Sequence, residues 1–246
     1  MKNKDISKRT AFILVAVLVA FRLFLAANQL IFAIPGSAPI DDDLYFALAR
    51  NIARGNWLGE YNYLTLSKYP FFAVYLAFIH FVNIPYLIAN CILWILAAAT
   101  AAFRAGPILK TRKARLFVFA ALVYNPSTWA QYTLRVYRDT LFPILCAFFF
   151  FATMGWALRI KEKASKWLPY LLISGISLAL VYISREDGYW IWPFAITGFA
   201  IVRIYLFIDK EAEKKAAKLL ISLAVPVVFT VAAVNTICSL NQKYYG

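Results

Sequence analysis

The sequence AFILVAVLVAFRLFLAANQLIFAI, residues 11–34, carries one charged side chain, Arg22, in a run long enough to cross a bilayer. A membrane-spanning helix needs about 20 mostly apolar residues. Further apolar runs of similar length occur at residues 86–103, 116–134, 140–158, 167–183, 189–208 and 219–240. The sequence therefore predicts an all-α, polytopic membrane protein with seven transmembrane helices.

Composition excludes the other broad classes of protein. Of the 246 residues, 63% are hydrophobic and 15% are charged, whereas soluble domains are about half apolar and a quarter charged. The three cysteines lie inside apolar runs, so a disulfide framework is not expected. The chain has no Gly-rich phosphate loop, zinc motif or nucleophile elbow. Soluble nucleotide chemistry is therefore not predicted.

The charge distribution predicts the topology. Residues 41–82 form a long loop, and the apolar segment 70–82 inside it is short for a span. If this segment does not cross and the N-terminus is cytoplasmic, most of the 26 lysines and arginines fall on the cytoplasmic side, as the positive-inside rule requires. If 70–82 crossed, this bias would disappear. We therefore expect 70–82 in the outer interface and an external C-terminus, and the +14 charge does not indicate nucleic-acid binding.

This topology places three charged clusters on the outer face, next to helix ends. Ionisable groups at the membrane boundary are costly and suggest a functional site. The clusters are Asp41-Asp42-Asp43, Arg135 with Arg138-Asp139, and Arg185-Glu186-Asp187.

Each cluster also has a structural alternative. Acids in a first helical turn contribute about 0.3–1 kcal/mol each through the helix dipole. Arg138-Asp139 is compatible with an ion pair that closes a helix entrance, and residues 185–187 with a self-neutralising turn. Lys68, two residues before Pro70, is suited either to lipid phosphate by snorkelling or to a substrate.

Two further segments have positions that bear on function. Apolar residues recur with helical spacing in 44–54, which predicts a surface helix ending at Gly55, with Trp57 at the interface.

Arg22 lies about 15 Å into the first span at 1.5 Å per residue. A cation there costs at least about 2.5 kcal/mol, so it should face a partner or a wet cavity. Packing and a polar pathway both remain open.

The order of these motifs resembles that of GT-C glycosyltransferases, such as protein O-mannosyltransferases and lipid A aminoarabinose transferases. The resemblance covers the layout of nearly the whole chain, with specific matches at about a dozen positions. In that family a seven-span module precedes further spans and often an external domain, so residues 1–246 would be this module, as a fragment or a minimal form. The matching motifs are Asp41-Asp42-x-x-Tyr45, Gly55-x-Trp57, Lys68-x-Pro70, Asn125-Pro126 and Arg138-Asp139-Thr140-Leu141.

The resemblance implies transfer of a hexosyl or pentosyl group from a polyprenyl-phosphate donor to a lipid, glycan or protein acceptor. The site would face the extracytoplasmic side of an inner membrane or of the endoplasmic reticulum, in envelope glycosylation or its equivalent. Asp41, with Asp42 beside it, would act as base or orient the acceptor, Lys68 would contact the donor phosphate, and Asp139 would assist. Some members use a divalent metal such as Mg²⁺ or Mn²⁺. The Asp triplet permits such an ion, with Asp41 and Asp42 as its ligands, but does not require one.

The residues are also suited to this chemistry without the resemblance. Inverting transfer needs a carboxylate to accept the proton of the acceptor hydroxyl, an effect of about 10²–10⁴-fold. It also needs cations for the leaving phosphate, and Lys68, Arg138 and Arg185 are the candidates. Residues assigned as accessory are Asp43, Tyr45, Arg135, Glu186 and Asp187. Of these, Asp43 and the 185–187 cluster depart from the pattern of the named relatives.

Two other functions compete with transfer. A transporter or lipid scramblase would favour polar residues through the bilayer midplane and broken helices in paired positions, and only Arg22 fits that pattern. A non-catalytic membrane subunit is the third hypothesis.

Overall fold

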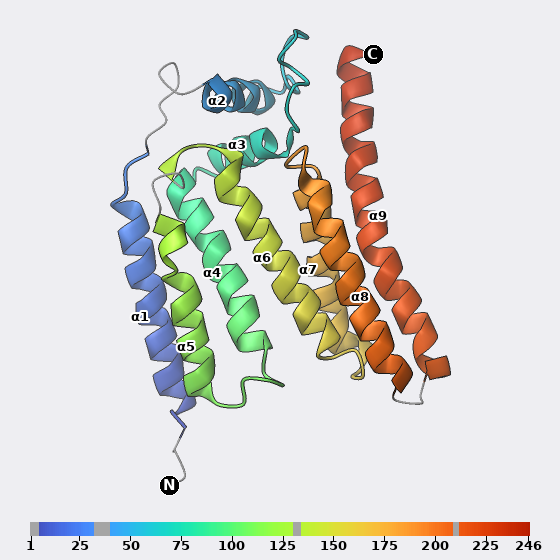
Figure 1. Ribbon diagram of the computed structural model, residues 1–246. Helices are drawn as coiled ribbons and strands as arrows, with labels where there is room; N and C mark the ends of the chain where they lie inside the picture. Colours follow the sequence, from blue (N-terminus) through green and yellow to red (C-terminus); the bar gives the residue numbers. More distant parts are fainter. Residues whose placement is uncertain (1–4, 32–39, 130–133, 209–211) are drawn as a thin grey trace. The chain divides into compact units, whose positions relative to one another are not determined.

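The computed structural model describes residues 5–31, 40–129, 134–208 and 212–246, and every regular element in them is a helix (Figure 1). The prediction of an all-α chain is confirmed. The chain divides into two compact units, which are described separately. Unit 1 comprises Met1–Asn56 and Phe72–Ile144, and unit 2 comprises Trp57–Phe71 and Leu145–Gly246.

In the described residues, five helices are long and apolar enough to cross a bilayer, as expected of a multi-pass membrane protein. The other two predicted spans correspond to α5 (Arg112–Val123) and α8 (Ile191–Ile208), which do not meet the same criterion of length and composition. Seven spans therefore stay a prediction. The five helices are α1 (Lys8–Ala27), α4 (Tyr86–Arg104), α6 (Arg138–Ala157), α7 (Ala164–Tyr182) and the Ile221–Tyr245 part of α9 (Ala212–Tyr245).

Helix α5 ends well before the predicted limit of the third span at residue 134. Its last helical residue is Val123, and a short 3₁₀ helix, η1 (Pro126–Trp129), follows. A residue that precedes proline is biased away from the helical region, so Asn125-Pro126 interrupts the helix within a run that is otherwise apolar. Hydropathy alone does not register this break.

The core of unit 1 lies where α1, α4 and α5 pack together. Small residues of α4 such as Ala98 and Ala102 are buried there against Phe119 and Val123 of α5. Alanine allows close approach of helix backbones, which is how helices associate inside a bilayer. At the start of α5, Asp5 accepts hydrogen bonds from the backbone amides of Arg112 and Lys113 at 2.9 and 3.2 Å. These bonds tie the N-terminal segment to α5 and hold the pKa of Asp5 below its usual value.

Two shorter helices of unit 1 lie across the ends of its long helices (Figure 1). They are α2 (Ile40–Ala53) and α3 (Phe71–Phe81). The ring of Tyr45 meets the ring of Phe72 edge-on, with centroids 4.9 Å apart, and joins α2 to α3. Helix α2 ends before Gly55, whose φ of 83° suits glycine. The surface helix predicted at residues 44–54 is therefore present.

Unit 2 is organised around the long helix α9. Gly175 of α7 lies so close to α9 that an added Cβ would be 3.0 Å from the Phe229 ring. Trp156, fully buried in α6, donates from Nε1 to Ser222 Oγ at 3.1 Å. The Trp57 indole donates to Asn241 Oδ1 at 2.8 Å, which fastens segment 57–71 to the end of α9.

Candidate functional site

Three consecutive carboxylates occupy the first turn of α2. Negative charge is stabilised at a helix N-terminus by the helix dipole. Successive residues point about 100° apart around a helix, so the three side chains meet different surroundings. Asp42 is fully buried, Asp41 is half-buried and Asp43 is exposed. The triplet is therefore three separate carboxylate environments.

Asp42 forms an ion pair with Arg135 in which the carboxylate is fully buried. Arg135 donates from Nη2 to Asp42 Oδ1 at 2.7 Å and from Nε to Oδ2 at 3.2 Å. The pKa of Arg135 is raised, first by this hydrogen bond to Asp42. Both carboxylate oxygens of Asp42 therefore bind the guanidinium, and the pair joins α2 to the segment before α6 across 93 residues of sequence. Such two-point pairing fixes orientation as well as charge.

Asp41 contacts a residue that the sequence analysis did not single out. The hydroxyl of Tyr137 donates to Asp41 Oδ2 at 3.1 Å. The guanidinium carbons of Arg135 and Arg138 lie 5.3 and 5.6 Å from the centroid of the Tyr137 ring. Burial is the main cause that raises the pKa of Tyr137 above its usual value. Tyr137 therefore stays protonated near neutral pH and can donate this hydrogen bond to Asp41.

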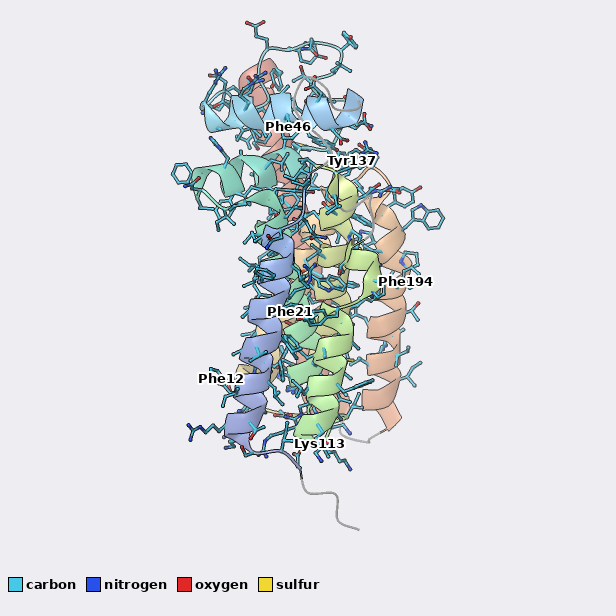
Figure 2. All side chains as sticks on the ribbon, turned by 90° about the vertical axis from the view of Figure 1, so that its left-hand side faces the viewer. Phe12, Phe21, Phe46, Lys113, Tyr137 and Phe194 are labelled. Carbon is cyan, nitrogen blue, oxygen red and sulfur yellow. The ribbon has the colours of Figure 1, made fainter. Side chains whose placement is uncertain are left out.

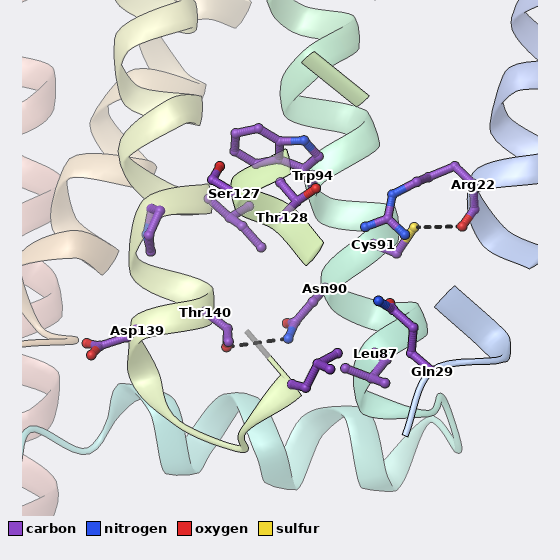
Figure 3. A pocket seen from close by; sticks show the side chains of 13 residues that line it. Arg22, Gln29, Leu87, Asn90, Cys91, Trp94, Ser127, Thr128, Asp139 and Thr140 are labelled. Atoms are coloured by element: carbon purple, nitrogen blue, oxygen red, sulfur yellow. Dashed lines mark hydrogen bonds between the residues drawn. The ribbon is translucent and has the colours of Figure 1, made fainter. Parts of the chain in front are cut away.

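A chain of hydrogen bonds supports the segment that carries Arg135 and Tyr137. The Tyr86 hydroxyl at the start of α4 donates to the carbonyl oxygen of Arg135 at 3.2 Å and is hydrogen bonded to Thr140 Oγ1. Asn90 donates from Nδ2 to Thr140 Oγ1 at 3.5 Å (Figure 3). Buried polar chains of this kind hold functional groups in one orientation. Tyr86 and Asn90 were not predicted as site residues from the sequence, although polar residues inside an apolar run are a usable signal.

Tyr45, predicted as an accessory residue of the site, has a packing role in the structure. Its ring is fully buried between Phe72 and Tyr137, at centroid distances of 4.9 and 6.1 Å. Tyr45 therefore packs beneath the carboxylates. Figure 2 shows Phe46 on α2 and Tyr137 below it, at the end of unit 1 opposite Lys113.

A polar cavity of about 90 Å³ lies beside this support, among the long helices of unit 1. Its polar lining comes from α1 and the residues just after it, from α4 and η1, and from the first turn of α6. Arg22 is only 4% exposed, and Figure 3 shows its guanidinium beside Cys91. Asp139 also borders the cavity, but in Figure 3 its carboxylate points away from Arg22. The polar groups are Arg22, Gln29, Asn90, Ser127, Thr128, Asp139 and Thr140.

The remaining predicted residues belong to unit 2. Arg185 donates from Nε and Nη2 to the two carboxylate oxygens of Asp187, at 2.7 and 3.0 Å. Burial, with the nearby phenol of Tyr182 and the carboxylate of Glu186, raises the pKa of Tyr69. Lys68 next to Tyr69 is half-buried and Glu186 is exposed. The 185–187 cluster thus contains the internal ion pair that its structural alternative anticipated.

The structure therefore sorts the predicted residues into two sets. In unit 1, the contacts bring the α2 carboxylates together with the residues that precede and begin α6. Hydrogen bonds join Asp42 to Arg135 and Asp41 to Tyr137. The predicted residues that unit 1 holds are Asp41, Asp42, Asp43, Tyr45, Arg135, Arg138 and Asp139. Unit 2 holds Lys68, Arg185, Glu186 and Asp187.

The carboxylates do not fit a divalent ion bridging Asp41 and Asp42. Both oxygens of Asp42 accept from Arg135, so a guanidinium already stands where a metal would bind. Within the described ranges, no group of three His, Cys, Asp or Glu residues has the arrangement of a metal site. The groups that the described contacts bring together at the start of α2 are carboxylate, phenol and guanidinium groups.

No family model, curated protein or solved structure matches the chain.

Proposed function

We propose that this chain is a membrane glycosyltransferase of the GT-C type, and that the α2 carboxylate site of unit 1 moves a sugar from a polyprenyl-phosphate donor to an acceptor hydroxyl. The observation that most supports the proposal is the difference between the environments of two adjacent acids. Asp42 is buried and held by Arg135, while Asp41 is half-buried and oriented by Tyr137. A carboxylate that is held in place and is accessible to the acceptor suits the role of general base.

In the proposed reaction, Asp41 accepts the proton of the acceptor hydroxyl as its oxygen attacks the anomeric carbon. The bond from that carbon to the phosphate oxygen breaks, and the polyprenyl phosphate leaves with the electron pair. Attack from the face opposite the phosphate inverts the configuration. Arg138, whose guanidinium carbon lies 5.6 Å from the centroid of the Tyr137 ring, stabilises charge on the leaving phosphate.

Asp42 and Arg135 act as positioning residues in this mechanism. Their ion pair fixes the first turn of α2 against the start of α6, and displacement of a reacting group by about 1 Å can cost about 100-fold in rate. Lys68 and Arg185 lie in unit 2, and a contact of either with the donor phosphate stays a prediction from the sequence. Their contribution is tested separately by Lys68→Gln and Arg185→Gln in the same transfer assay.

The test is sugar transfer by the purified full chain in lipid vesicles, with radiolabelled polyprenyl-phosphate sugars and a panel of lipid, glycan and peptide acceptors. Asp41→Asn should lower the rate by at least about 100-fold while the thermal midpoint stays near that of the wild type. The matched control is Glu60→Gln, which removes an exposed carboxylate outside the site and should retain full activity. Equal rates for Asp41→Asn and wild type would remove Asp41 from the mechanism.

The cavity that contains Arg22 favours one competing function, lipid scrambling. A buried cation in a polar cavity among apolar helices is a feature of translocation pathways. Reconstituted vesicles with a fluorescent phospholipid in both leaflets distinguish the functions, since scrambling exposes the inner-leaflet dye to an external quencher. The transferase proposal predicts no such exposure above protein-free vesicles, and exposure that Arg22→Leu abolishes would favour scrambling.

A further inference from the structure

A second and much larger concavity of unit 1 lies between α2 and α3. It is a groove of about 1160 Å³, larger than the roughly 300–1,000 Å³ typical of small-molecule sites. Its walls are mostly apolar, with contributions from both helices and from Ile84 and Val136. The polar groups at the groove are Asp43, Arg50, Arg54, His80 and Tyr86.

The sequence of α2 explains why this groove exists. Positions 43, 46, 47, 50, 53 and 54 follow helical spacing and form one stripe, and all six line the groove. A second stripe of α2, which includes Tyr45 and Leu48, is buried in unit 1. Helix α2 therefore has two faces that carry apolar residues. One holds it on the protein, and the other presents Phe46, Ala47 and Ala53 to the groove.

Charge is distributed unevenly along the groove. Arg50 and Arg54 are exposed and lie one helical turn apart near the end of α2. Asp43 lies near the start of α2, about 16 Å from Arg54 at 1.5 Å per residue. An elongated ligand with an anionic group at one end would therefore place that group at the two arginines. The apolar walls between the ends suit a hydrocarbon chain.

The position of the groove indicates where such a ligand comes from. Helices α2 and α3 lie across the ends of the long apolar helices of unit 1 (Figure 1). In a bilayer spanned by those long helices, this end would lie at the level where phospholipid head groups meet the acyl region. We propose that the groove holds one acyl chain of an anionic phospholipid, with its phosphate bound by Arg50 and Arg54. This site requires no transfer reaction, so it stands or falls independently of the proposed function.

The test uses the purified full chain in phosphatidylcholine nanodiscs. A phosphatidylglycerol with a diazirine in one acyl chain is photo-crosslinked to the protein, and the labelled peptides are mapped by mass spectrometry. Crosslinks should lie in residues 46–54 and 76–80. Unlabelled phosphatidylglycerol should compete for them, whereas diacylglycerol, which lacks the phosphate, and glycerol phosphate, which lacks the chains, should compete poorly.

Variants separate the two recognition elements. Replacement of one arginine should lower the affinity for phosphatidylglycerol, measured by competition, by about fivefold. The double variant Arg50→Gln with Arg54→Gln should lower it by about 25-fold. The charge-conserving pair Arg50→Lys with Arg54→Lys should remain within about twofold of wild type. Ala53→Trp fills the groove at an exposed position and should abolish the crosslinks.

The matched control is Lys110→Gln with Lys113→Gln, which removes two exposed cations of unit 1 outside the groove. This double variant should leave the groove crosslinks unchanged. Unchanged crosslinking in the double arginine variant, or labelled peptides confined to the sides of the long helices, would overturn the proposal. Competition by glycerol phosphate equal to that of phosphatidylglycerol would also overturn it, because it would show a phosphate site without a chain site.

Discussion

The Asp42–Arg135 pair provides a prediction that can be worked through quantitatively. Arg135→Gln leaves the Asp42 carboxylate at 0% exposure without its cation. Removal of one partner of a buried ion pair costs about 3–5 kcal/mol, and the 38% exposure of the Arg135 side chain places this case at the lower end, about 3 kcal/mol. For a chain of this size, about 3 kcal/mol corresponds to a fall of roughly 6–12 °C in the thermal midpoint.

Asp42→Asn should cost less, about 1–2 kcal/mol, because a neutral amide stays hydrogen bonded and Arg135 can reach solvent. The double variant Asp42→Asn with Arg135→Gln should recover at least about 1 kcal/mol relative to the sum of the single changes, which is typical coupling for residues in contact. The assay is thermal unfolding of the purified chain in mild detergent, with Lys113→Gln as an exposed-charge control. Additive effects, with coupling below about 0.5 kcal/mol, would refute the claim that this pair positions α2.

Three further changes test other contacts of the two units. Tyr86→Phe removes the hydrogen bond to the Arg135 carbonyl. It should lower stability by about 1–3 kcal/mol in thermal unfolding and should reduce the rate of transfer. Stability equal to that of the wild type would argue that Tyr86 does not support the segment that carries Arg135. The raised pKa of Tyr137 predicts that its phenolate absorbance, measured as the difference between titrations of the wild type and Tyr137→Phe, appears only above pH 10. Stability should fall as the pH rises through that range. Ionisation below pH 10 would contradict the burial of Tyr137. Gly188→Ala places a Cβ 2.6 Å from the Val181 carbonyl oxygen and should destabilise unit 2 by about 1–3 kcal/mol. The control is Gly198→Ala, whose added Cβ has its nearest contact at 3.9 Å and should not have this cost.

The long helices could be predicted from the sequence because the bilayer imposes a simple rule on them. About 20 apolar residues in a row satisfy that rule wherever they occur, and α4, α6 and α7 lie close to their predicted ranges. Helix α1 ends at Ala27, whereas the first span was predicted to extend to residue 34. The third predicted span was drawn too long since hydropathy continues through Asn125-Pro126, whereas the helix ends at Val123. Backbone geometry, and not composition, determines that end.

The candidate site could be predicted only in part. Runs such as Asp41-Asp42-Asp43 are visible because charge is rare in this chain, but their pairing is a long-range property. The contact of Asp42 with Arg135 spans 93 residues and that of Asp41 with Tyr137 spans 96. Adjacent aspartates also look equivalent until the buried face of α2 is known. Tyr137 was missed because one tyrosine among 15 carries no signal without its neighbours in space.

The account rests most heavily on the placement of the carboxylate end of unit 1 at the extracytoplasmic surface, with the basic segment around Lys113 on the cytoplasmic side. The direct measurement introduces single cysteines, Asn56→Cys and Lys113→Cys, into a chain whose three native cysteines are replaced by alanine. Intact cells are then treated with a membrane-impermeant maleimide. The account predicts that Asn56→Cys is labelled in intact cells and that Lys113→Cys is labelled only after lysis. Labelling of Lys113→Cys from outside would contradict the topology and, with it, the proposed site of transfer.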